Sequence, residues 1–202
     1  MKIGIVNYGA GNLFSVKQGL EKAKATVEII LPNSGSLEAF DALVLPGVGA
    51  FKPAMETIAP IKDKLKEELE GGKPLLGICL GLQLLFSSSD EGGKTTGLAI
   101  LLGNIKKLSE SVKLPQIGWN TIEIKKQNPL LQGVNDGSYV YFVHSYVCKP
   151  NEIGVVISET DYGERFPSVI ARRNIYATQF HPEKSGKIGQ RILENFVALT
   201  RR

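Results

Sequence analysis

The fold of this chain is indicated first by the stretch Pro74-Leu75-Leu76-Gly77-Ile78-Cys79-Leu80-Gly81-Leu82-Gln83-Leu84-Leu85-Phe86. It predicts a short apolar strand, a sharp turn with Cys79 at its apex, and an apolar helix. Glycines two residues before and two residues after Cys79 have the spacing of a nucleophile elbow, where missing side chains let strand and helix pack closely. The turn places the sulfur near a helix N-terminus, where backbone N–H groups and the dipole favour a thiolate. A buried structural cysteine is the alternative, and the elbow alone identifies neither reaction nor substrate.

Composition limits the function classes. The chain has 202 residues, 43% of them hydrophobic, which predicts one domain spanning 1–202. Its 24 Lys and Arg against 20 Asp and Glu are scattered and form no basic patch interleaved with aromatics, which argues against nucleic-acid binding. Two cysteines suit a reducing compartment. The N-terminus reads as a strand rather than a signal peptide, and no apolar run approaches the ~20 residues of a membrane span. We therefore expect a soluble, cytoplasmic domain that does not contact membranes.

The two halves of the sequence differ in pattern. The first alternates strands and helices, with strands expected at Ile3–Val6, Val27–Leu31, Ala42–Leu45 and Leu75–Ile78 and helices near Leu13–Lys24 and Ile58–Glu70. The second is richer in strands, at Thr121–Lys125, Tyr139–Val147, Val155–Ser158, Ser168–Ala171 and Ile175–Phe180, before a final helix with Ile188, Ile192, Phe196 and Leu199 at helical spacing. Unbroken apolar strands separated by helices predict an α/β fold with a mostly parallel central sheet. In such sheets ligands bind at the carboxyl ends of the strands, where Cys79 lies.

A cysteine nucleophile needs a base, and the chain has two histidines, His144 and His181. His181 lies in Gln179-Phe180-His181-Pro182-Glu183, directly after an apolar strand. Because Pro182 favours an extended backbone, His181 and Glu183 are expected on the same side, where the carboxylate orients the imidazole. A surface turn is the alternative for this motif by itself. His144 has no acid nearby in sequence and is expected to be packed near the site rather than to act as the base.

A thioester mechanism also needs an oxyanion hole. The N–H of Leu80, directly after the nucleophile, is the expected first donor. The loop Gly47-Val48-Gly49 can supply the second from Val48, because its glycines let the backbone approach a substrate carbonyl.

No cofactor or metal is expected. Gly9-Ala10-Gly11 and Gly47-Val48-Gly49 each begin a dinucleotide-binding pattern, but both lack its third glycine. The two cysteines and two histidines show no metal-ligand spacing.

Three separated motifs resemble those of the class I glutamine amidotransferases: Pro46-Gly47-Val48-Gly49, Gly77-Ile78-Cys79-Leu80-Gly81-Leu82-Gln83 and Gln179-Phe180-His181-Pro182-Glu183. The resemblance implies a three-layer, flavodoxin-like α/β fold and release of ammonia from glutamine. It implies a Cys79–His181–Glu183 triad, with Val48 and Leu80 stabilising the oxyanion.

Further segments resemble the glutaminase subunits that serve imidazole glycerol phosphate synthesis: Asn7–Leu13, Gly118–Asn120, Tyr141–Tyr146 and Lys184-Ser185. This narrower resemblance implies glutamine binding by Gly47, Gly49, Gln83, Ser145 and Tyr146. It implies a heterodimer with a cyclase subunit of (β/α)8-barrel fold, and an interface near Asn12, Trp119, Tyr141 and Lys184. Gln116 departs from the pattern, because the family more often has histidine there.

Three other functions stay open. The nearest is a class I glutaminase feeding anthranilate or pyridoxal phosphate synthesis, against which Asn7–Leu13 and Tyr141–Tyr146 argue. A cysteine hydrolase without an ammonia acceptor predicts fast turnover by the isolated chain. A silent binding subunit predicts that Cys79 behaves as an ordinary thiol.

Overall fold

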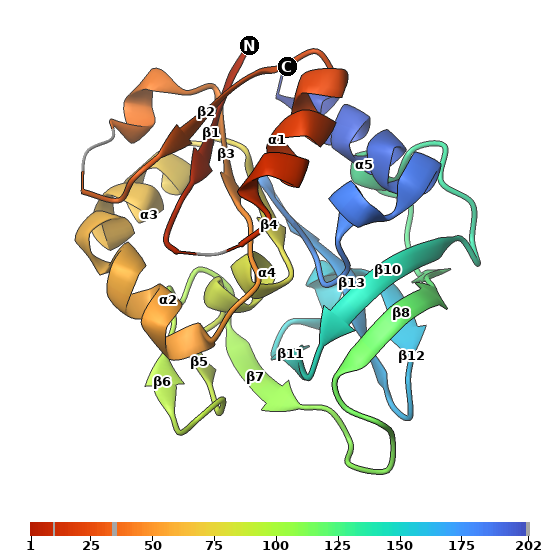
Figure 1. Cartoon of the computed structure of the whole chain (residues 1–202). Helices are drawn as coiled ribbons and strands as arrows, with labels where there is room; N and C mark the ends of the chain where they lie inside the picture. The colour runs from red at the N-terminus through yellow and green to blue at the C-terminus, as the bar shows by residue number, and fades with distance from the viewer. Residues whose placement is uncertain (10, 34–35, 201–202) are drawn as a thin grey trace.

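The structure is a computed structural model that describes residues 1–9, 11–33 and 36–200 (Figure 1). The central strands are β1 (Lys2–Val6), β2 (Thr26–Ile30), β3 (Ala42–Leu45), β4 (Leu75–Ile78), β9 (Glu123–Ile124), β12 (Val156–Asp161), β13 (Arg165–Arg172) and β14 (Ile175–Thr178). Within the described residues they form an eight-stranded sheet in the order β2-β1-β3-β4-β14-β13-β12-β9. Neighbours from β2 to β14 pair parallel, and β13, β12 and β9 continue the sheet antiparallel. The predicted mostly parallel α/β sheet is confirmed.

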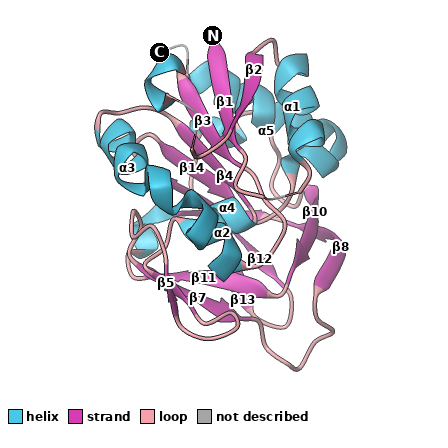
Figure 2. Cartoon of the chain, turned by 60° about the vertical axis from the view of Figure 1, so that its left-hand side comes forward, coloured by secondary structure: helices cyan, strands magenta, loops and turns pink. Residues whose placement is uncertain are grey.

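Helices cover both faces of this sheet (Figures 1 and 2). One face carries α1 (Leu13–Lys22) and α5 (Gly186–Leu199), and the other carries α2 (Phe51–Ile58), α3 (Lys62–Glu70) and α4 (Leu80–Leu84). Alternate strand residues point to opposite layers. Val44 of β3 packs in the cluster that contains Phe196 of α5, whereas Leu45 packs in the cluster that contains Phe51 of α2. The strands are apolar throughout because both of their faces are buried.

Two smaller sheets extend the carboxyl-end side of the central one. Strand β10 (Tyr139–His144) pairs antiparallel with β8 (Gln116–Thr121). A second small sheet has the order β11-β7-β5-β6, from β11 (Tyr146–Pro150), β7 (Gly103–Lys107), β5 (Ser88–Ser89) and β6 (Thr95–Thr96). In Figure 2 this sheet lies at the opposite end of the molecule from the chain termini. The remaining elements are 3-10 turns at Leu37–Ala39, Ala59–Ile61, Pro129–Leu131, Ile153–Val155 and Pro182–Lys184.

Some predicted elements differ from the structure. The apolar run Tyr139–Val147 is not one strand, because the chain changes partner at Ser145: β10 pairs with β8 and β11 pairs with β7. The predicted helix 58–70 begins as an α-helix only at Lys62, and helix α2 before it was not predicted. The described helices are all too short or too polar to cross a bilayer.

Candidate active site

The predicted strand, turn and helix around Cys79 are present. Cys79 follows β4 and precedes α4, with φ 51° and ψ −102°, a backbone conformation that is strained for a residue with a side chain. Gly81 makes the close packing possible, since a Cβ there would lie 1.9 Å from the carbonyl oxygen of Leu45 on the neighbouring strand. The elbow therefore fixes Cys79 at the carboxyl edge of the sheet.

Cys79 is almost fully buried, at 5% exposure. Its Sγ lies 3.7 Å from the carbonyl oxygen of Val143, which accepts the thiol hydrogen. The side-chain amide of Gln179 approaches from another direction, with Nε2 3.6 Å from Sγ. Gln179 is part of the motif that contains His181, but its residue type alone did not predict a contact with the sulfur.

His181 and Glu183 meet as predicted. The imidazole Nδ1 lies 2.7 Å from Oε1 of Glu183, and both side chains are buried. The extended backbone that Pro182 predicts for His181 is present. It does not by itself bring the two side chains together, because the 3-10 turn Pro182–Lys184 is what places Glu183 against the imidazole. Glu183 Oε1 also accepts a hydrogen bond from the side-chain amide of Asn12. Oε1 of Glu183 thus accepts from both His181 and Asn12. The carboxylate holds the imidazole by its Nδ1, so that Nε2 is free to contact the Cys79 thiol.

Electrostatics couple His181 to Cys79. Burial lowers the pKa of His181, but the charge of Cys79 and the contacts with Cys79 and Glu183 outweigh burial and raise the pKa to about 10. Among the described residues His181 Nε2 completes no hydrogen bond of good geometry. An imidazole with its inner nitrogen on a carboxylate and its outer nitrogen facing a thiol can act as general base and then as general acid.

Val48 and Leu80, the two residues predicted to supply oxyanion donors, line the same cavity next to Cys79. The N–H of Leu80 donates to the carbonyl oxygen of Gly47 at 3.4 Å, so it is engaged rather than open to a ligand. The carbonyl of Val48 accepts from the N–H of Gly11 at 3.4 Å, and the buried hydroxyl of Tyr8 donates to Pro46. For Leu80 to stabilise an oxyanion, the Gly47 carbonyl has to turn away from it.

A cavity of about 250 Å³ opens onto Cys79. Besides Leu80, five residues that were predicted to form the oxyanion hole or to bind glutamine line this cavity: Val48, Gly49, Gln83, Ser145 and Tyr146. Gly47 does not line it and contributes its carbonyl to Leu80 instead. Gln83 Nε2 donates to the carbonyl of Tyr146 at 2.9 Å, which joins α4 to β11.

Glu91, which also lines this cavity, was not predicted from the sequence. Its carboxylate accepts the N–H of Phe51 at 2.9 Å and thereby supports the start of α2. Its neighbours Asp90, Gly92 and Gly93 form an ordinary polar turn in sequence, so nothing distinguishes it from a surface residue.

His144 is packed near the site, as predicted, and is buried at 6% exposure. Its Nδ1 lies 3.1 Å from the carbonyl oxygen of Tyr146, so the neutral ring carries its proton there. Burial, reinforced by the charge of His181, lowers the pKa of His144 to about 4. Gln116 pairs with His144 across β8 and β10, and its side-chain oxygen is buried without a partner among the described residues.

The residues predicted to face a partner gather next to His181 and Glu183. The rings of Trp119 and Tyr141 meet edge to face with centroids 6.0 Å apart, and Lys184 Nζ lies 5.8 Å from the centre of the Tyr141 ring. Trp119 is 55% exposed although its ring is large and apolar. Asn12 is connected to this group through Glu183, the neighbour of Lys184.

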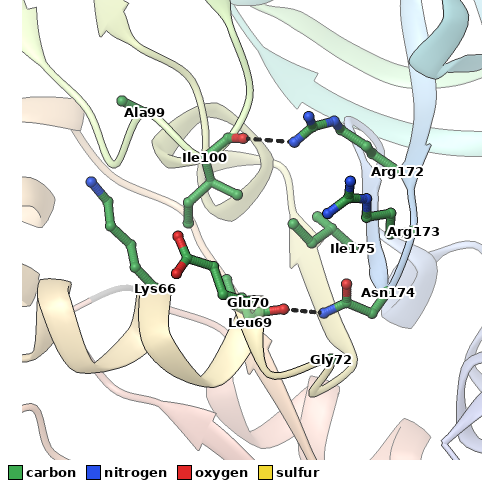
Figure 3. A pocket seen from close by; sticks show the side chains of 10 residues that line it. All are labelled: Lys66, Leu69, Glu70, Gly72, Ala99, Ile100, Arg172, Arg173, Asn174 and Ile175. Carbon is green, nitrogen blue, oxygen red and sulfur yellow. Dashed lines mark hydrogen bonds between the residues drawn. The ribbon is translucent and has the colours of Figure 1, made fainter.

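A second cavity lies at the opposite edge of the central sheet, where β4 and β14 begin (Figure 3). It measures about 310 Å³, and Lys66, Glu70, Arg172 and Arg173 contribute charged side chains to it. The residues that line it include no cysteine, histidine, serine or threonine, so it offers no thiol, hydroxyl or imidazole group for catalysis. Nor do the described residues bring three His, Cys, Asp or Glu side chains together as a metal site requires. The cavity at Cys79 is therefore the candidate active site.

Residues 4–199 match the family model "Glutamine amidotransferase class-I". The chain is 50% identical to "Imidazole glycerol phosphate synthase subunit HisH" of Halobacterium salinarum, covering 96% of this chain and 92% of the relative. It is 49% identical to the protein of the same name from Methanocaldococcus jannaschii, covering 98% of this chain and 99% of the relative.

Solved structures agree with the fold. One described as "glutamine amidotransferase" has a TM-score of 0.75 at 20% identity and covers 99% of both chains. A structure of PurLQS from Thermotoga maritima has a TM-score of 0.76 at 17% identity and covers 98% of both chains. At these identities the likeness concerns the fold alone, whereas the sequence relatives define the family. The chain belongs to the class I glutamine amidotransferases and, within them, to the HisH subunits of imidazole glycerol phosphate synthase.

Proposed function

We propose that Cys79, His181 and Glu183 are the catalytic triad with which this HisH chain hydrolyses glutamine to glutamate and ammonia. His181 removes the thiol proton of Cys79, and the sulfur attacks the side-chain amide carbon of glutamine. The protonated imidazole then gives its proton to the departing ammonia, which leaves a thioester. Water, activated by His181, hydrolyses the thioester and releases glutamate.

The observation that carries this proposal is the buried pair of His181 Nδ1 and Glu183 Oε1, 2.7 Å apart. It fixes the tautomer in which Nε2 faces the sulfur, and the carboxylate stabilises the imidazolium that forms. The strained backbone of Cys79 supports the same role, because such conformations persist where the surrounding structure enforces them for function.

Glutamine binds in the cavity at Cys79. The α-ammonium and α-carboxylate groups of the substrate need polar partners in that cavity. Glu91 supplies a negative charge in that cavity for the α-ammonium group. Gln83 and the backbones of Gly47, Gly49, Ser145 and Tyr146 supply the remaining polar contacts. Val48 and Leu80 donate to the oxyanion once the Gly47 carbonyl has released the Leu80 N–H.

Ammonia passes to the cyclase subunit HisF, a (β/α)8 barrel, in a heterodimer. That subunit uses it to form imidazole glycerol phosphate and an aminoimidazole carboxamide ribonucleotide in histidine biosynthesis. The interface includes Asn12, Trp119, Tyr141 and Lys184. Its support is the exposed ring of Trp119 on Tyr141, because large exposed aromatics mark association surfaces.

The whole chain acts as one domain, which the family match over residues 4–199 supports. We place the enzyme in the cytoplasm, where a reducing environment keeps the free thiol of Cys79 intact.

The decisive assay is ammonia release from glutamine by the chain alone and with the cyclase and its nucleotide ligand. We expect weak release alone and a large rise with the cyclase, because the Leu80 N–H donates to the Gly47 carbonyl and is not open to an oxyanion. The Cys79→Ala variant must release no ammonia in either case while still binding the cyclase. Ammonia release by Cys79→Ala would refute the triad, and equal release with and without the cyclase would refute the partner.

A further inference from the structure

We propose that Gln179 is a positioning residue whose side-chain amide donates a hydrogen bond to the sulfur of Cys79 and stabilises its ionised form. The proposal rests on the glutaminase chemistry above and adds to it a group that acts on the nucleophile from outside the triad.

Gln179 is held in place at the carboxyl end of β14. It is completely buried, and its backbone N–H donates to the carbonyl of Ser168 at 2.9 Å. A glutamine in such a position must find partners for its amide inside the protein. Its partners are the Cys79 sulfur, 3.6 Å from Nε2, and the amide of Gln83, 3.4 Å from Oε1.

The direction of this amide follows from a chain of contacts. The carbonyl of Tyr146 can only accept, so the nitrogen of the Gln83 amide must face it, at 2.9 Å. The same nitrogen has a second hydrogen directed at Gln179, which must therefore present its oxygen to Gln83. The nitrogen of Gln179 is then left facing the sulfur. The Tyr146 backbone thus dictates that Gln179 is a donor toward Cys79.

A donor on this side of the sulfur has a defined chemical effect. The Val143 carbonyl, 3.7 Å from Sγ, interacts favourably with the thiol and unfavourably with a thiolate. The Gln179 N–H favours the thiolate, because hydrogen bonds to an ionised group stabilise the ionised form. Since Gln83 also lines the substrate cavity, one amide chain connects that cavity to the nucleophile.

The test measures the alkylation rate of Cys79 by iodoacetamide as a function of pH, in the full-length protein. Only the thiolate reacts, so the midpoint of the profile reports ionisation. Cys148 is fully buried, which raises the pKa of its thiol to about 12, and the Cys79→Ala protein provides the blank. In Gln179→Met, which keeps the length of the side chain but has no N–H, we expect the midpoint to rise by about one pH unit, a tenfold loss of thiolate below it.

A second variant, Gln179→Glu, tests the direction in which the alkylation midpoint shifts. Gln179→Glu still accepts from Gln83 but presents a carboxylate oxygen to the sulfur, so its midpoint must rise further than that of Gln179→Met. It also carries the test alone should Gln179→Met fail to fold. The matched control is Ser168→Ala, which removes another buried hydrogen bond, to Ser158, without touching Sγ, and must leave the midpoint unchanged. A midpoint in Gln179→Glu equal to or below that of the unmodified protein would overturn the proposal.

Measurements of glutamine turnover distinguish a failure of this proposal from a failure of the proposed function. With the cyclase present, Gln179→Glu is expected to lower kcat while leaving KM for glutamine within about twofold, because Gln83 keeps its partner. The alkylation profile needs no glutamine turnover, so an unmodified protein without glutaminase activity would refute the function and leave the Gln179 result standing.

Discussion

The stability of this protein is expected to fall between about pH 7 and about pH 5 because of one buried side chain, His144. Burial and the nearby charge of His181 lower its pKa from 6.5 to about 4 in the folded protein. Its Nε2 is buried with no hydrogen-bond partner among the described residues, so a proton added there would find no acceptor. Protonation is therefore resisted only while the chain is folded.

The sign follows from the proton count. In the unfolded chain His144 takes up its proton as pH falls through 6.5, whereas the folded chain takes it up only near pH 4. Between these values the unfolded state binds more protons, so acidification favours unfolding. The contribution of neutral His144 is intact above pH 6.5 and is lost progressively down to pH 4. The full difference amounts to about 3 kcal/mol, of which about 2 kcal/mol is already lost at about pH 5.

The matched variant is His144→Asn, whose side-chain nitrogen can keep the bond to the Tyr146 carbonyl but has no proton to gain. Urea unfolding of both proteins, followed by far-UV circular dichroism, gives the free energy of unfolding at each pH. The unmodified protein must lose about 2 kcal/mol more than His144→Asn between about pH 7 and about pH 5. All other groups, His181 included, titrate in both proteins and cancel in the comparison. Parallel curves for the two proteins would refute the reasoning.

Three further substitutions test the elbow, the triad and the partner surface. Gly81→Ala should destabilise the protein by about 3 kcal/mol in urea unfolding, since its Cβ would lie 1.9 Å from the Leu45 carbonyl oxygen; an unchanged midpoint would contradict this close packing at the turn. Glu183→Gln keeps an oxygen for His181 but loses the charge that stabilises the imidazolium, so kcat measured by ammonia release should fall about a hundredfold or more with KM little changed. Trp119→Ala should weaken cyclase binding by about 2 kcal/mol in titration calorimetry, and unaltered affinity would move the interface elsewhere.

The elements that could be predicted from the sequence are those whose residue pattern has a single physical cause. Ala42–Leu45 and Leu75–Ile78 are strands with the predicted bounds because both faces of each strand are buried, which demands an unbroken apolar run. Strand β7 is different: it has the polar sequence Gly-Asn-Ile-Lys-Lys, with only Gly103 and Ile105 buried, and no pattern distinguishes it from a loop. Helix α2 begins immediately after the glycine loop and has Pro53 in its first turn. Proline is tolerated at that position, but in a sequence it indicates the end of a helix, so α2 was not predicted.

The residues of the candidate site also divide into those that the sequence predicts and those that it does not. Cys79, His181 and Glu183 could be named because each type of chemistry restricts the residue that performs it and because local spacing brings acid and base together. The amide of Gln179 and the carboxylate of Glu91 could not be named, since glutamine and glutamate are common residues and their positions depend on contacts between distant segments. Gln179 meets Cys79 only because β14 pairs with β4 in parallel, which aligns Thr178 with Ile78.

The register of these two strands also explains why Cys79 and His181 are close. Thr178 and Ile78 are partners at the carboxyl ends of neighbouring parallel strands, and the N–H of Cys79 donates to the Thr178 carbonyl at 2.7 Å. One strand then turns sharply at Cys79, while the other continues through Gln179 to His181. A shift of one residue in this register would point Cys79 and Gln179 to opposite faces of the sheet, because side chains alternate along a strand. The buried pairing of β4 with β14 is thus a structural requirement of the proposed triad as much as the elbow glycines are.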